Sequence, residues 1–466
     1  MLDKVEKEVS SFRDTYGEVY YYQNKIIRSV NKAGANDYEL IRDNEIITKS
    51  IENNFLIETK EIDKNIFKDQ FINSSHLLES ELIQHISYPY EWSFEQLKVA
   101  SLHHLKFQIF LFDLNAVLRD ASAYNIQFKG SKPIFIDVLS IRMYKEGEYW
   151  LAYKQFCENF LNPLLLRYLK NLPHNNWFRG ALEGIETTEL NNLLSLKDKF
   201  SFKVFGHVVM QANLIQKAIN KPETSSLKVK KLKKYPKSSY RAILVQLYNW
   251  IKTFKLKKNK TIFKNYSKNN TYKIKEIEDK KKIVNQFTKK YKPDILIDLG
   301  CNTGDFSEEA LDNGAKYVVG YDFDQNVIDE AFKRSKEKQL NFLPLFLDAS
   351  NPSPNQGWMQ RERKGFNERN KANALIALAF EHHLSIAKNI PLEEIIEWIT
   401  KLAPVGLIEF VPKTDETVQK MLENREDIFD QYTQNNFEKV LSSKTQIINN
   451  TKVSNSGRLI YEFEIL

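Results

Sequence analysis

The sequence predicts an α/β protein with a mostly parallel C-terminal sheet and a separate N-terminal α+β domain. The chain has 466 residues, about three times the ~150 residues of an average domain, so we expect more than one core. A strongly basic stretch interrupts a chain that is otherwise acidic on balance, and beyond it short apolar runs alternate with helical patterns. Hydrophobic residues make up 42% and charged residues 27%, which excludes wholesale disorder and a collagen-like fibre.

The sequence also predicts the cellular compartment of the protein. The sequence has no apolar run of about 18 residues, so no membrane-spanning helix is expected. Residues 1–8 mix both charges, whereas a signal peptide has a basic start and an apolar core. The two cysteines, Cys157 and Cys301, are too few for a disulfide framework or a four-cysteine zinc site. We therefore expect a cytoplasmic protein.

In the N-terminal domain, residues 1–215, the clearest element is a long helix that follows Ser93. Ser93 and Gln96 have the spacing of a capping box, and apolar residues recur at helical intervals as far as Phe112. The helix leads to Leu118-Arg-Asp-Ala-Ser-Ala-Tyr-Asn125, and an apolar strand then ends at Asp137.

These residues are similar to the C-lobe of protein-kinase-like folds. The resemblance implies a catalytic-loop aspartate at Asp120, an accompanying asparagine at Asn125 and a metal-binding aspartate at Asp137. The chain departs from that pattern because Leu118 replaces the usual histidine and no glycine-rich phosphate loop is present; Lys60 is the candidate phosphate-contacting lysine. Three interpretations stay open: an unrelated α/β module with turn-capping residues, a kinase-like scaffold without phosphoryl transfer, and an active kinase.

The basic stretch forms the predicted linker, residues 216–275. From 217 to 292 the chain holds 24 Lys and Arg residues against four acidic ones. Within this stretch, Ile243, Leu247, Trp250 and Ile251 are spaced as on one face of an amphipathic helix. Such a helix docks on a neighbouring domain, lies on an anionic lipid surface, or helps to grip nucleic acid.

The C-terminal domain, residues 276–466, alternates helices with short apolar strands. The last two strands have no helix between them and predict a terminal hairpin. A parallel sheet of this kind binds its ligand outside the carboxyl ends of its strands. The expected strands cover residues 295–299, 317–321, 342–347, 374–380, 406–411, 444–448 and 458–465.

The first of these strands ends in a glycine-containing turn, Asp298-Leu-Gly-Cys-Asn-Thr-Gly304. A strand that turns at once into a helix, with a ligand pressed on its backbone, needs residues with access to positive φ. Gly300 and Gly304 have that access, and Asn302 tolerates it better than most residues. The spacing differs from the Gly-x-Gly-x-x-Gly of dinucleotide sites because Asn302 takes the place of the middle glycine.

The next two strands also end in carboxylates. Asp322 closes the second strand, where a carboxylate accepts hydrogen bonds from ribose hydroxyls. Asp348 closes the third strand and is followed by Ala349, so a side chain and a backbone amide are placed to meet an adenine edge. Each aspartate alone is typical of a turn, but matched strand ends in sequence favour a nucleoside site.

With these motifs, residues 280–466 resemble the class I S-adenosylmethionine (SAM) dependent methyltransferase family. The resemblance implies a Rossmann-like sheet of seven strands and SAM as the methyl donor. It places Gly300 and Gly304 at the methionine part of SAM, Asp322 at the ribose and Asp348 at the adenine. Further motifs look like the nodulation-protein-like subgroup of these methyltransferases: Asp298-Leu-Gly-Cys-Asn-Thr-Gly-Asp-Phe-Ser307, Asn351-Pro-Ser-Pro354, Gly357-Trp358, Arg361-Glu-Arg363 and His382-His-Leu384.

Two histidines, His382 and His383, follow the fourth strand at the mouth of the predicted cleft. An imidazole accepts a proton near neutral pH, so these residues are the candidate catalytic bases. Two other interpretations stay open, in which they line the donor pocket or lie on the surface. Without matching cysteine or carboxylate ligands they do not indicate a metal.

The leading hypothesis is a methyltransferase that moves a methyl group from SAM to an acceptor held by the N-terminal domain. The subgroup resemblance implies a saccharide, a glycan-linked molecule or another small molecule as the acceptor. The alternative is an RNA methyltransferase that grips nucleic acid through residues 217–292 and stacks bases on aromatic residues such as Tyr240, Trp250 and Tyr266. In a third hypothesis, SAM only signals its presence to an interaction module.

Overall fold

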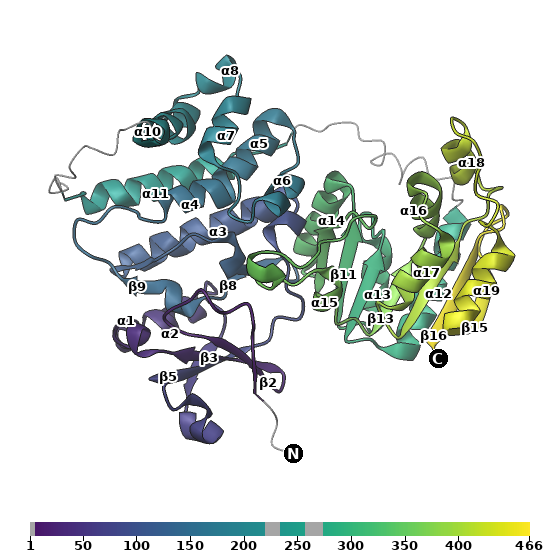
Figure 1. Cartoon of the computed structure of the whole chain (residues 1–466), viewed down its shortest axis with the longest axis horizontal. Coiled ribbons are helices and arrows are strands. Elements are labelled where there is room, and N and C mark those ends of the chain that lie inside the picture. The colour runs from purple at the N-terminus through teal and green to yellow at the C-terminus, as the bar shows by residue number, and fades with distance from the viewer. Residues whose placement is uncertain (1–4, 220–233, 257–273) are drawn as a thin grey trace.

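The computed structural model describes residues 5–219, 234–256 and 274–466. An N-terminal body and a C-terminal α/β domain lie side by side in these ranges (Figure 1). No helix in the described part of the chain is long and apolar enough to cross a membrane. The basic runs of the predicted linker at 228–233 and 257–260, and Tyr266, lie outside the described residues.

The N-terminal body begins with an antiparallel sheet of five strands in the order β1-β2-β3-β5-β4. Ile27 and Leu77 face one side of this sheet, where they pack on Phe67 and Phe71 of a short 3-10 helix. Two helices separate the third strand from the fourth. The elements are β1 (Glu6–Lys7), β2 (Val19–Tyr22), β3 (Lys25–Val30), α1 (Lys32–Asp43), α2 (Ile46–Glu52), β4 (Thr59–Ile62), η1 (Lys64–Phe71) and β5 (His76–Glu81).

The rest of the N-terminal body is mostly helical and is organised around α3 (Phe94–Asp113). The predicted capping box is present, because the Gln96 amide donates to Ser93 Oγ and the Ser93 amide donates to the Gln96 side chain at 2.9 Å. Two small antiparallel pairs follow the helix. They are β6 (Ala116–Leu118) with β9 (Ile141–Met143) and β7 (Ile126–Lys129) with β8 (Lys132–Phe135). The later helices are α4 (Tyr153–Phe156), α5 (Asn162–Lys170), α6 (Asn175–Gly180), α7 (Thr187–Leu193), α8 (Leu196–Lys199), α9 (Phe202–Val204) and α10 (Met210–Ile219).

The amphipathic helix of the linker, α11 (Lys237–Lys252), docks on α3. Its buried face includes Leu247, Trp250 and Ile251, as the spacing predicts, whereas Ile243 is only half-buried and Leu244 is buried in its place. At the edge of the contact the Arg241 guanidinium donates hydrogen bonds to both carboxylate oxygens of Asp113, at 2.8 and 2.9 Å. Of the three interpretations of this helix, the structure shows domain docking.

The C-terminal domain contains a seven-stranded sheet in the order β12-β11-β10-β13-β14-β16-β15. The first five strands in this order are parallel, and the last two form the predicted antiparallel hairpin. The strands are β10 (Ile295–Leu299), β11 (Tyr317–Asp322), β12 (Phe342–Phe346), β13 (Ala374–Ala377), β14 (Val405–Phe410), β15 (Thr445–Lys452) and β16 (Leu459–Ile465). The sheet is therefore the predicted class I methyltransferase arrangement.

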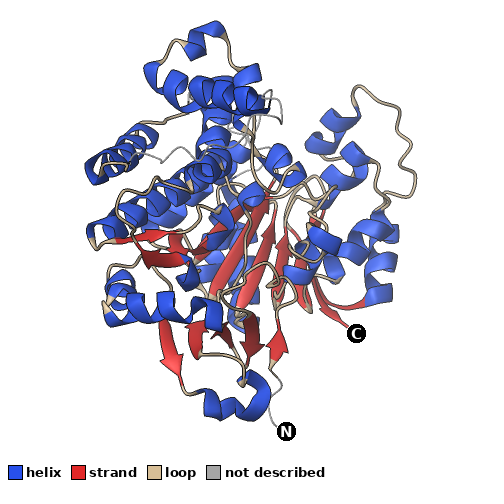
Figure 2. Cartoon of the chain, turned by 60° about the vertical axis from the view of Figure 1, so that its left-hand side comes forward, coloured by secondary structure: helices blue, strands red, loops and turns tan. Residues whose placement is uncertain are grey.

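Helices cover both faces of this sheet (Figure 2). Adjacent residues of a strand point to opposite sides of the sheet, so the apolar strands present apolar side chains on both faces. Leu296 packs with Val284 and Phe287 of one layer, whereas Ile297 belongs to the core of the opposite layer. The helices are α12 (Ile274–Tyr291), α13 (Asp305–Asp312), α14 (Gln325–Lys338), α15 (Phe366–Arg369), α16 (Glu381–Lys388), α17 (Leu392–Thr400), α18 (Glu416–Leu422) and α19 (Gln434–Lys444).

The fourth strand is shorter than its apolar run predicts. The run extends to Phe380, but β13 ends at Ala377 and the backbone turns at Ala379, which has a φ of 51°. The turn releases Phe380 and α16 from the sheet at its carboxyl edge. This is the edge at which the predicted donor residues lie.

The N-terminal body packs against the β12 side of the sheet (Figure 1). Phe128 meets Phe332 of α14 edge to face, with ring centroids 5.8 Å apart. The Gly130 amide donates to the Tyr317 hydroxyl at 3.3 Å. The two parts of the chain therefore share a continuous apolar core.

Candidate active site

The turn after β10 is built from backbone conformations that favour glycine. Gly300, Asn302 and Gly304 have φ values of 76°, 48° and 83°. The amide of Gly300 donates to the Tyr321 carbonyl at 2.8 Å, which fixes the turn to the end of β11. A Cβ at Gly304 would lie 2.5 Å from the Phe342 ring, so a larger residue does not fit. The turn therefore leaves exposed backbone at the carboxyl edge, as the sequence predicts.

Asp322 lies directly against this turn. Its Oδ2 accepts from the Asn302 amide at 3.1 Å, and its Oδ1 accepts from the Asp324 amide at 2.9 Å. Burial raises the pKa of Asp322 to about 6, although the backbone amides oppose the shift. Each carboxylate oxygen keeps accepting capacity, which suits a pair of ribose hydroxyls.

Asp298 lies deeper, below the turn. Its Oδ2 accepts from Ser307 Oγ at 2.6 Å, which connects the end of β10 to α13. Burial raises the pKa of Asp298 to about 7, and the neighbouring charge of Asp322 adds to the shift. The structure thus brings Asp298, Asn302 and Asp322 together in one place.

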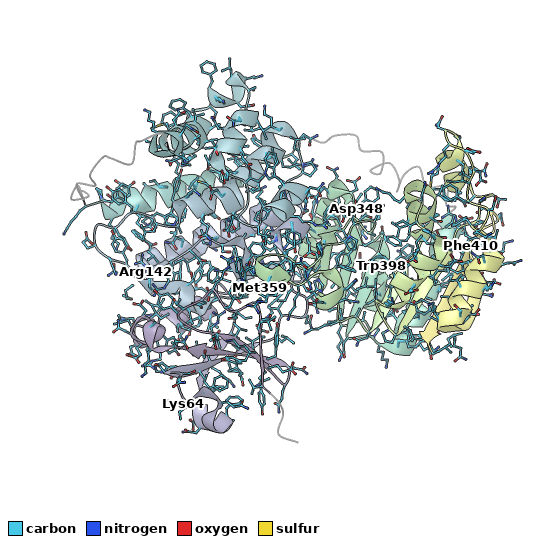
Figure 3. All side chains as sticks on the ribbon, in the orientation of Figure 1. Lys64, Arg142, Asp348, Met359, Trp398 and Phe410 are labelled. Atoms are coloured by element: carbon cyan, nitrogen blue, oxygen red, sulfur yellow. The ribbon has the colours of Figure 1, made fainter. Side chains whose placement is uncertain are left out.

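The third strand end reaches the same edge of the sheet because β12 runs parallel to β11. Asp348 Oδ1 accepts from the Ser350 amide at 3.0 Å and from Ser350 Oγ at 2.6 Å. Ala349 next to it is half-buried. Figure 3 labels Asp348 at the upper end of the sheet. The residue therefore forms a local turn while its second carboxylate oxygen remains available, which is compatible with the predicted adenine contact.

The two histidines differ in their access to solvent. His382 is completely buried, and neither ring nitrogen has a hydrogen-bond partner among the described residues. His383 is partly exposed, and its ring centroid lies 4.2 Å from that of His382. Burial lowers the pKa of both to about 3, so both imidazoles are neutral at pH 7. Of the two side chains, only that of His383 is partly exposed.

A buried ion pair behind the histidines was missed by the sequence analysis. Lys280 Nζ lies 2.7 Å from both carboxylate oxygens of Glu409, and both side chains are almost wholly buried. Glu409 also accepts from the amide of Ala379 at 2.8 Å, which holds the left-handed turn after β13. Burial lowers the pKa of Lys280 to about 8, while Glu409 acts in the opposite direction. Lys280 lies in a lysine run, but its spacing to Val284 and Phe287 marked it as part of the buried helix face.

The turn after β13 covers the glycine-containing turn after β10. A Cβ at Gly300 would meet the Phe380 ring at 3.3 Å, so the two turns are in close contact. Glu381, which follows Phe380 and begins α16, is held in place because its carboxylate accepts from the Val411 amide and from the Tyr432 hydroxyl, both at 2.9 Å. Burial raises the pKa of Glu381 to about 8. These contacts fix the start of α16 relative to the turn after β10.

In the N-terminal body, Asp120 and Asn125 form a local pair. The Asn125 side-chain amide donates to Asp120 Oδ2 at 3.0 Å, and burial raises the pKa of Asp120 to about 6. Asp137 Oδ1 accepts a hydrogen bond from Arg28 Nη1 of β3 at 2.8 Å. Lys60 is not at this place and pairs with Glu79 across the sheet. Within the described ranges, no group of three or more His, Cys, Asp and Glu side chains is arranged to hold a metal ion.

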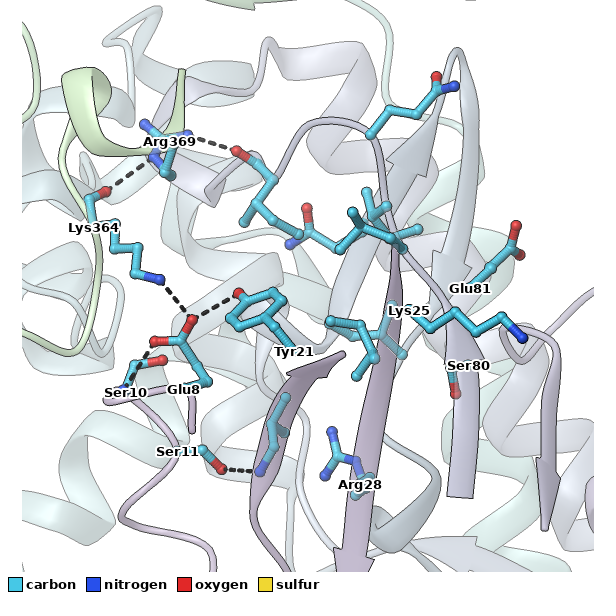
Figure 4. Close-up of a pocket in the computed structure, with 18 of the residues that line it drawn as sticks. Glu8, Ser10, Ser11, Tyr21, Lys25, Arg28, Ser80, Glu81, Lys364 and Arg369 are labelled. Carbon is cyan, nitrogen blue, oxygen red and sulfur yellow. Dashed lines mark hydrogen bonds and ion pairs between the residues drawn. The ribbon is translucent and has the colours of Figure 1, made fainter. Parts of the chain in front are cut away.

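A cavity of about 610 Å³ lies between the N-terminal sheet and the C-terminal segment 362–371. Figure 4 shows Lys364 and Arg369 reaching into it from the C-terminal domain. Glu8 accepts from Lys364 Nζ and from the Tyr21 hydroxyl, both at 2.7 Å. Arg369 Nη1 donates to the Ile86 carbonyl at 2.6 Å. Both domains therefore build the walls of this cavity.

The segment between Asp348 and the cavity is held by the N-terminal body. Arg179 donates to the carbonyls of Asn351 and Pro352 at 2.8 and 3.0 Å. Further along, Arg369 forms a buried ion pair with Glu91. The same stretch of chain therefore starts at the predicted donor site and becomes a wall of the cavity.

The chain is similar to known proteins over most of its length. A family model described as FtsJ-like methyltransferase matches residues 266–453. The chain is 44% identical over 459 residues to "Nodulation protein NoeA" of Rhizobium meliloti (strain 1021), covering 97% of this chain and 95% of that protein.

Two solved structures are also similar. The PH0226 protein from Pyrococcus horikoshii OT3 has a TM-score of 0.32 and 18% identity, covering 44% of this chain and 99% of its own. The N-methyltransferase NodS from Bradyrhizobium japonicum WM9, in complex with S-adenosyl-L-homocysteine, has a TM-score of 0.31 and 10% identity, covering 41% of this chain and 87% of its own.

Proposed function

We propose an acceptor for this enzyme on the premise that the chain belongs to the family of nodulation protein NoeA and is a SAM-dependent methyltransferase. The acceptor is a saccharide or a saccharide-linked small molecule, and part of it binds in the cavity between the two domains. The observation that carries this proposal is that one continuous segment, residues 348–371, begins at the Asp348 strand end of the donor site and goes on to form one wall of the cavity.

The donor side of the proposal rests on the strand ends. Asp322 would accept from the ribose hydroxyls, Asp348 and the Ala349 amide would meet the adenine, and Gly300 and Gly304 would leave room for the methionine part. The residues fit SAM because the turn carries no Cβ at Gly300 or Gly304 and Asp322 has accepting capacity to spare. SAM supplies an electrophilic methyl group on its sulfonium.

The acceptor side rests on the chemistry of the cavity. Its volume of about 610 Å³ is in the range of small-molecule sites, roughly 300–1,000 Å³. The rings of Tyr21, Tyr88 and Tyr124 line it together with charged groups such as Glu8 and Arg363. Sugar rings present apolar C–H faces and several hydroxyls, so aromatic rings beside carboxylates and guanidinium groups suit them.

Proton transfer is assigned to His383. Methylation of a hydroxyl needs an acceptor for its proton, and a neutral, partly exposed imidazole at the start of α16 can take that proton as the new bond forms. The low pKa, about 3, keeps His383 unprotonated at pH 7 but makes it a weak base. His382 is assigned to the wall of the donor pocket because it is sealed from solvent.

The RNA alternative loses part of its support in the fold. Two of the aromatic residues proposed to stack bases, Tyr240 and Trp250, are buried between α11 and the N-terminal body. Trp250 packs edge to face on Phe254, with centroids 5.3 Å apart. These rings are therefore not available to nucleic acid.

The first experiment identifies the acceptor class. The protein is incubated with methyl-labelled SAM and an extract of cells that make it, with Asp322→Ala as the control. We expect label in a nuclease-resistant, carbohydrate-containing fraction, and no label with Asp322→Ala. Label that nuclease releases would refute the saccharide and favour RNA.

A second experiment tests the cavity with a matched pair of variants. The hydroxyls of Tyr124 and Tyr90 are both buried without a well-formed hydrogen bond to a described residue, but only Tyr124 lines the cavity. Tyr124→Phe should raise the acceptor KM by about threefold to tenfold, the effect of one lost hydrogen bond, and leave SAM binding unchanged. Tyr90→Phe should leave both quantities unchanged. Equal acceptor KM values for the two variants would place the acceptor elsewhere.

A further inference from the structure

The end of the N-terminal body farthest from its sheet carries a cluster of exposed apolar side chains. We call residues 196–205, which include α8 and α9, the tip; α8 is labelled at the top of Figure 1. Leu196 is 78% exposed, Phe200 87% and Phe202 84%. Phe205 of the tip and Met210 beyond it are also exposed. Single exposed apolar residues are ordinary, but several within one short segment mark a contact surface.

Polar contacts of Asp198 attach the tip to the rest of the N-terminal body and leave its apolar side chains exposed. Ser195 and Asp198 form a capping box in which the Ser195 amide donates to Asp198 Oδ2 at 2.9 Å. Asp198 is also held by Lys170 of α5, with its Nζ 2.5 Å from Oδ2. The α8 turn buries none of its four residues. The tip is therefore tied to the body by its acid, and Leu196 remains on the outside.

The charge left on the tip is positive. Lys197 and Lys199 alternate with the apolar residues and form no ion pair with a described residue, and Lys203 lies 5.8 Å from the Trp250 ring. The acid of the tip, Asp198, is already paired with Lys170. The tip thus presents apolar side chains between lysines without a compensating acid.

We propose that this tip binds the surface of an anionic lipid bilayer. Phe and Leu side chains enter the boundary between headgroups and acyl chains, while neighbouring lysines stay at the level of the headgroup phosphates. The proposal goes beyond the methyl transfer and does not depend on which acceptor the enzyme uses. It gives the protein a membrane-facing end on the α8 side of the N-terminal body.

Two other occupants fit the observations less well. A second copy of the chain would bring like-charged lysines together around the apolar contact, which is unfavourable. Single-stranded nucleic acid would stack on Phe200 and Phe202, but the aliphatic side chains of Leu196 and Met210 offer bases no aromatic face. A lipid surface uses both kinds of apolar side chain.

The test compares two double variants of the full chain in vesicle sedimentation. Phe200→Ser/Phe202→Ser removes the aromatic side chains of the tip. The matched control is Ile66→Ser/Ile72→Ser, which removes two exposed apolar side chains at and beside η1, on the N-terminal sheet. The probes are phosphatidylcholine vesicles with and without phosphatidylglycerol, and SAM binding by calorimetry checks that each variant folds.

We expect the natural chain to sediment with phosphatidylglycerol vesicles and not with pure phosphatidylcholine, and its binding to weaken with salt. Phe200→Ser/Phe202→Ser should lower the partition coefficient by roughly tenfold for each Phe, whereas the control variant should bind as the natural chain does. Equal binding by both double variants would overturn the proposal. A dimer mass in light scattering that is lost in Phe200→Ser/Phe202→Ser would also overturn it, because a second copy would then cover the tip.

Discussion

The raised pKa of Asp322 predicts that donor binding depends on pH. The ribose hydroxyls donate to the ionised carboxylate, whereas a protonated carboxyl offers one acceptor fewer and competes as a donor. Because the pKa of Asp322 is raised to about 6, donor affinity should be highest above pH 6. It should fall as the pH drops through 6.

The expected size follows from the ionised fraction. With a pKa of about 6, the carboxylate is about 90% ionised at pH 7 and about 10% ionised at pH 5. If only the ionised form binds, the Kd at pH 5 is about ten times the Kd at pH 7, or about 1.4 kcal/mol. Above pH 7 the Kd should level off.

Calorimetry with S-adenosylhomocysteine measures this dependence, since its ribose is that of SAM and its amino acid group does not titrate between pH 5 and 7. Asp322→Asn should bind more weakly and independently of pH. Asp298→Asn is the second control, because burial raises the pKa of Asp298 to about 7 and its titration must be separated from that of Asp322. A constant Kd in the natural chain, or the same tenfold change in Asp322→Asn, would refute the assignment of Asp322 to the ribose.

Three substitutions test the contacts around the site. Glu409→Gln removes the charge of a buried carboxylate that pairs with Lys280 and also faces Arg458, and should cost about 3–5 kcal/mol of stability, seen as a lower Tm; an unchanged Tm would contradict the buried pair. Arg369→Ala leaves Glu91 uncompensated and should speed proteolysis between the domains while SAM binding persists; equal cleavage rates would show that the pair does not hold the domains. Gly304→Ala has neither the backbone freedom nor the space for a Cβ, so donor affinity should fall by at least about tenfold, and tight binding by this variant would mean that the turn relaxes.

Local patterns were sufficient for the conformation of the turn after β10 and for the order of strands and helices in the C-terminal domain. Gly300 and Gly304 were predictable because positive φ is a property of the turn itself, and the capping box at Ser93 depends on residues three apart. The amphipathic spacing of α11 predicted its apolar face, but three partners for that face remained open until the structure placed it on α3.

The amino-acid sequence by itself determined the alternation of strands and helices in the C-terminal domain, the carboxylates at the ends of its first three strands and most of the apolar faces of α3 and α11, because those features depend on neighbours along the chain. Only the tertiary structure decided which charges are buried. Lys280 and Glu409 are 129 residues apart, and Glu8 and Lys364 are 356 apart. Their electrostatics arise from contacts between distant segments, and the desolvation that shifts the pKa values of His383 and Asp322 exists only once the chain is packed.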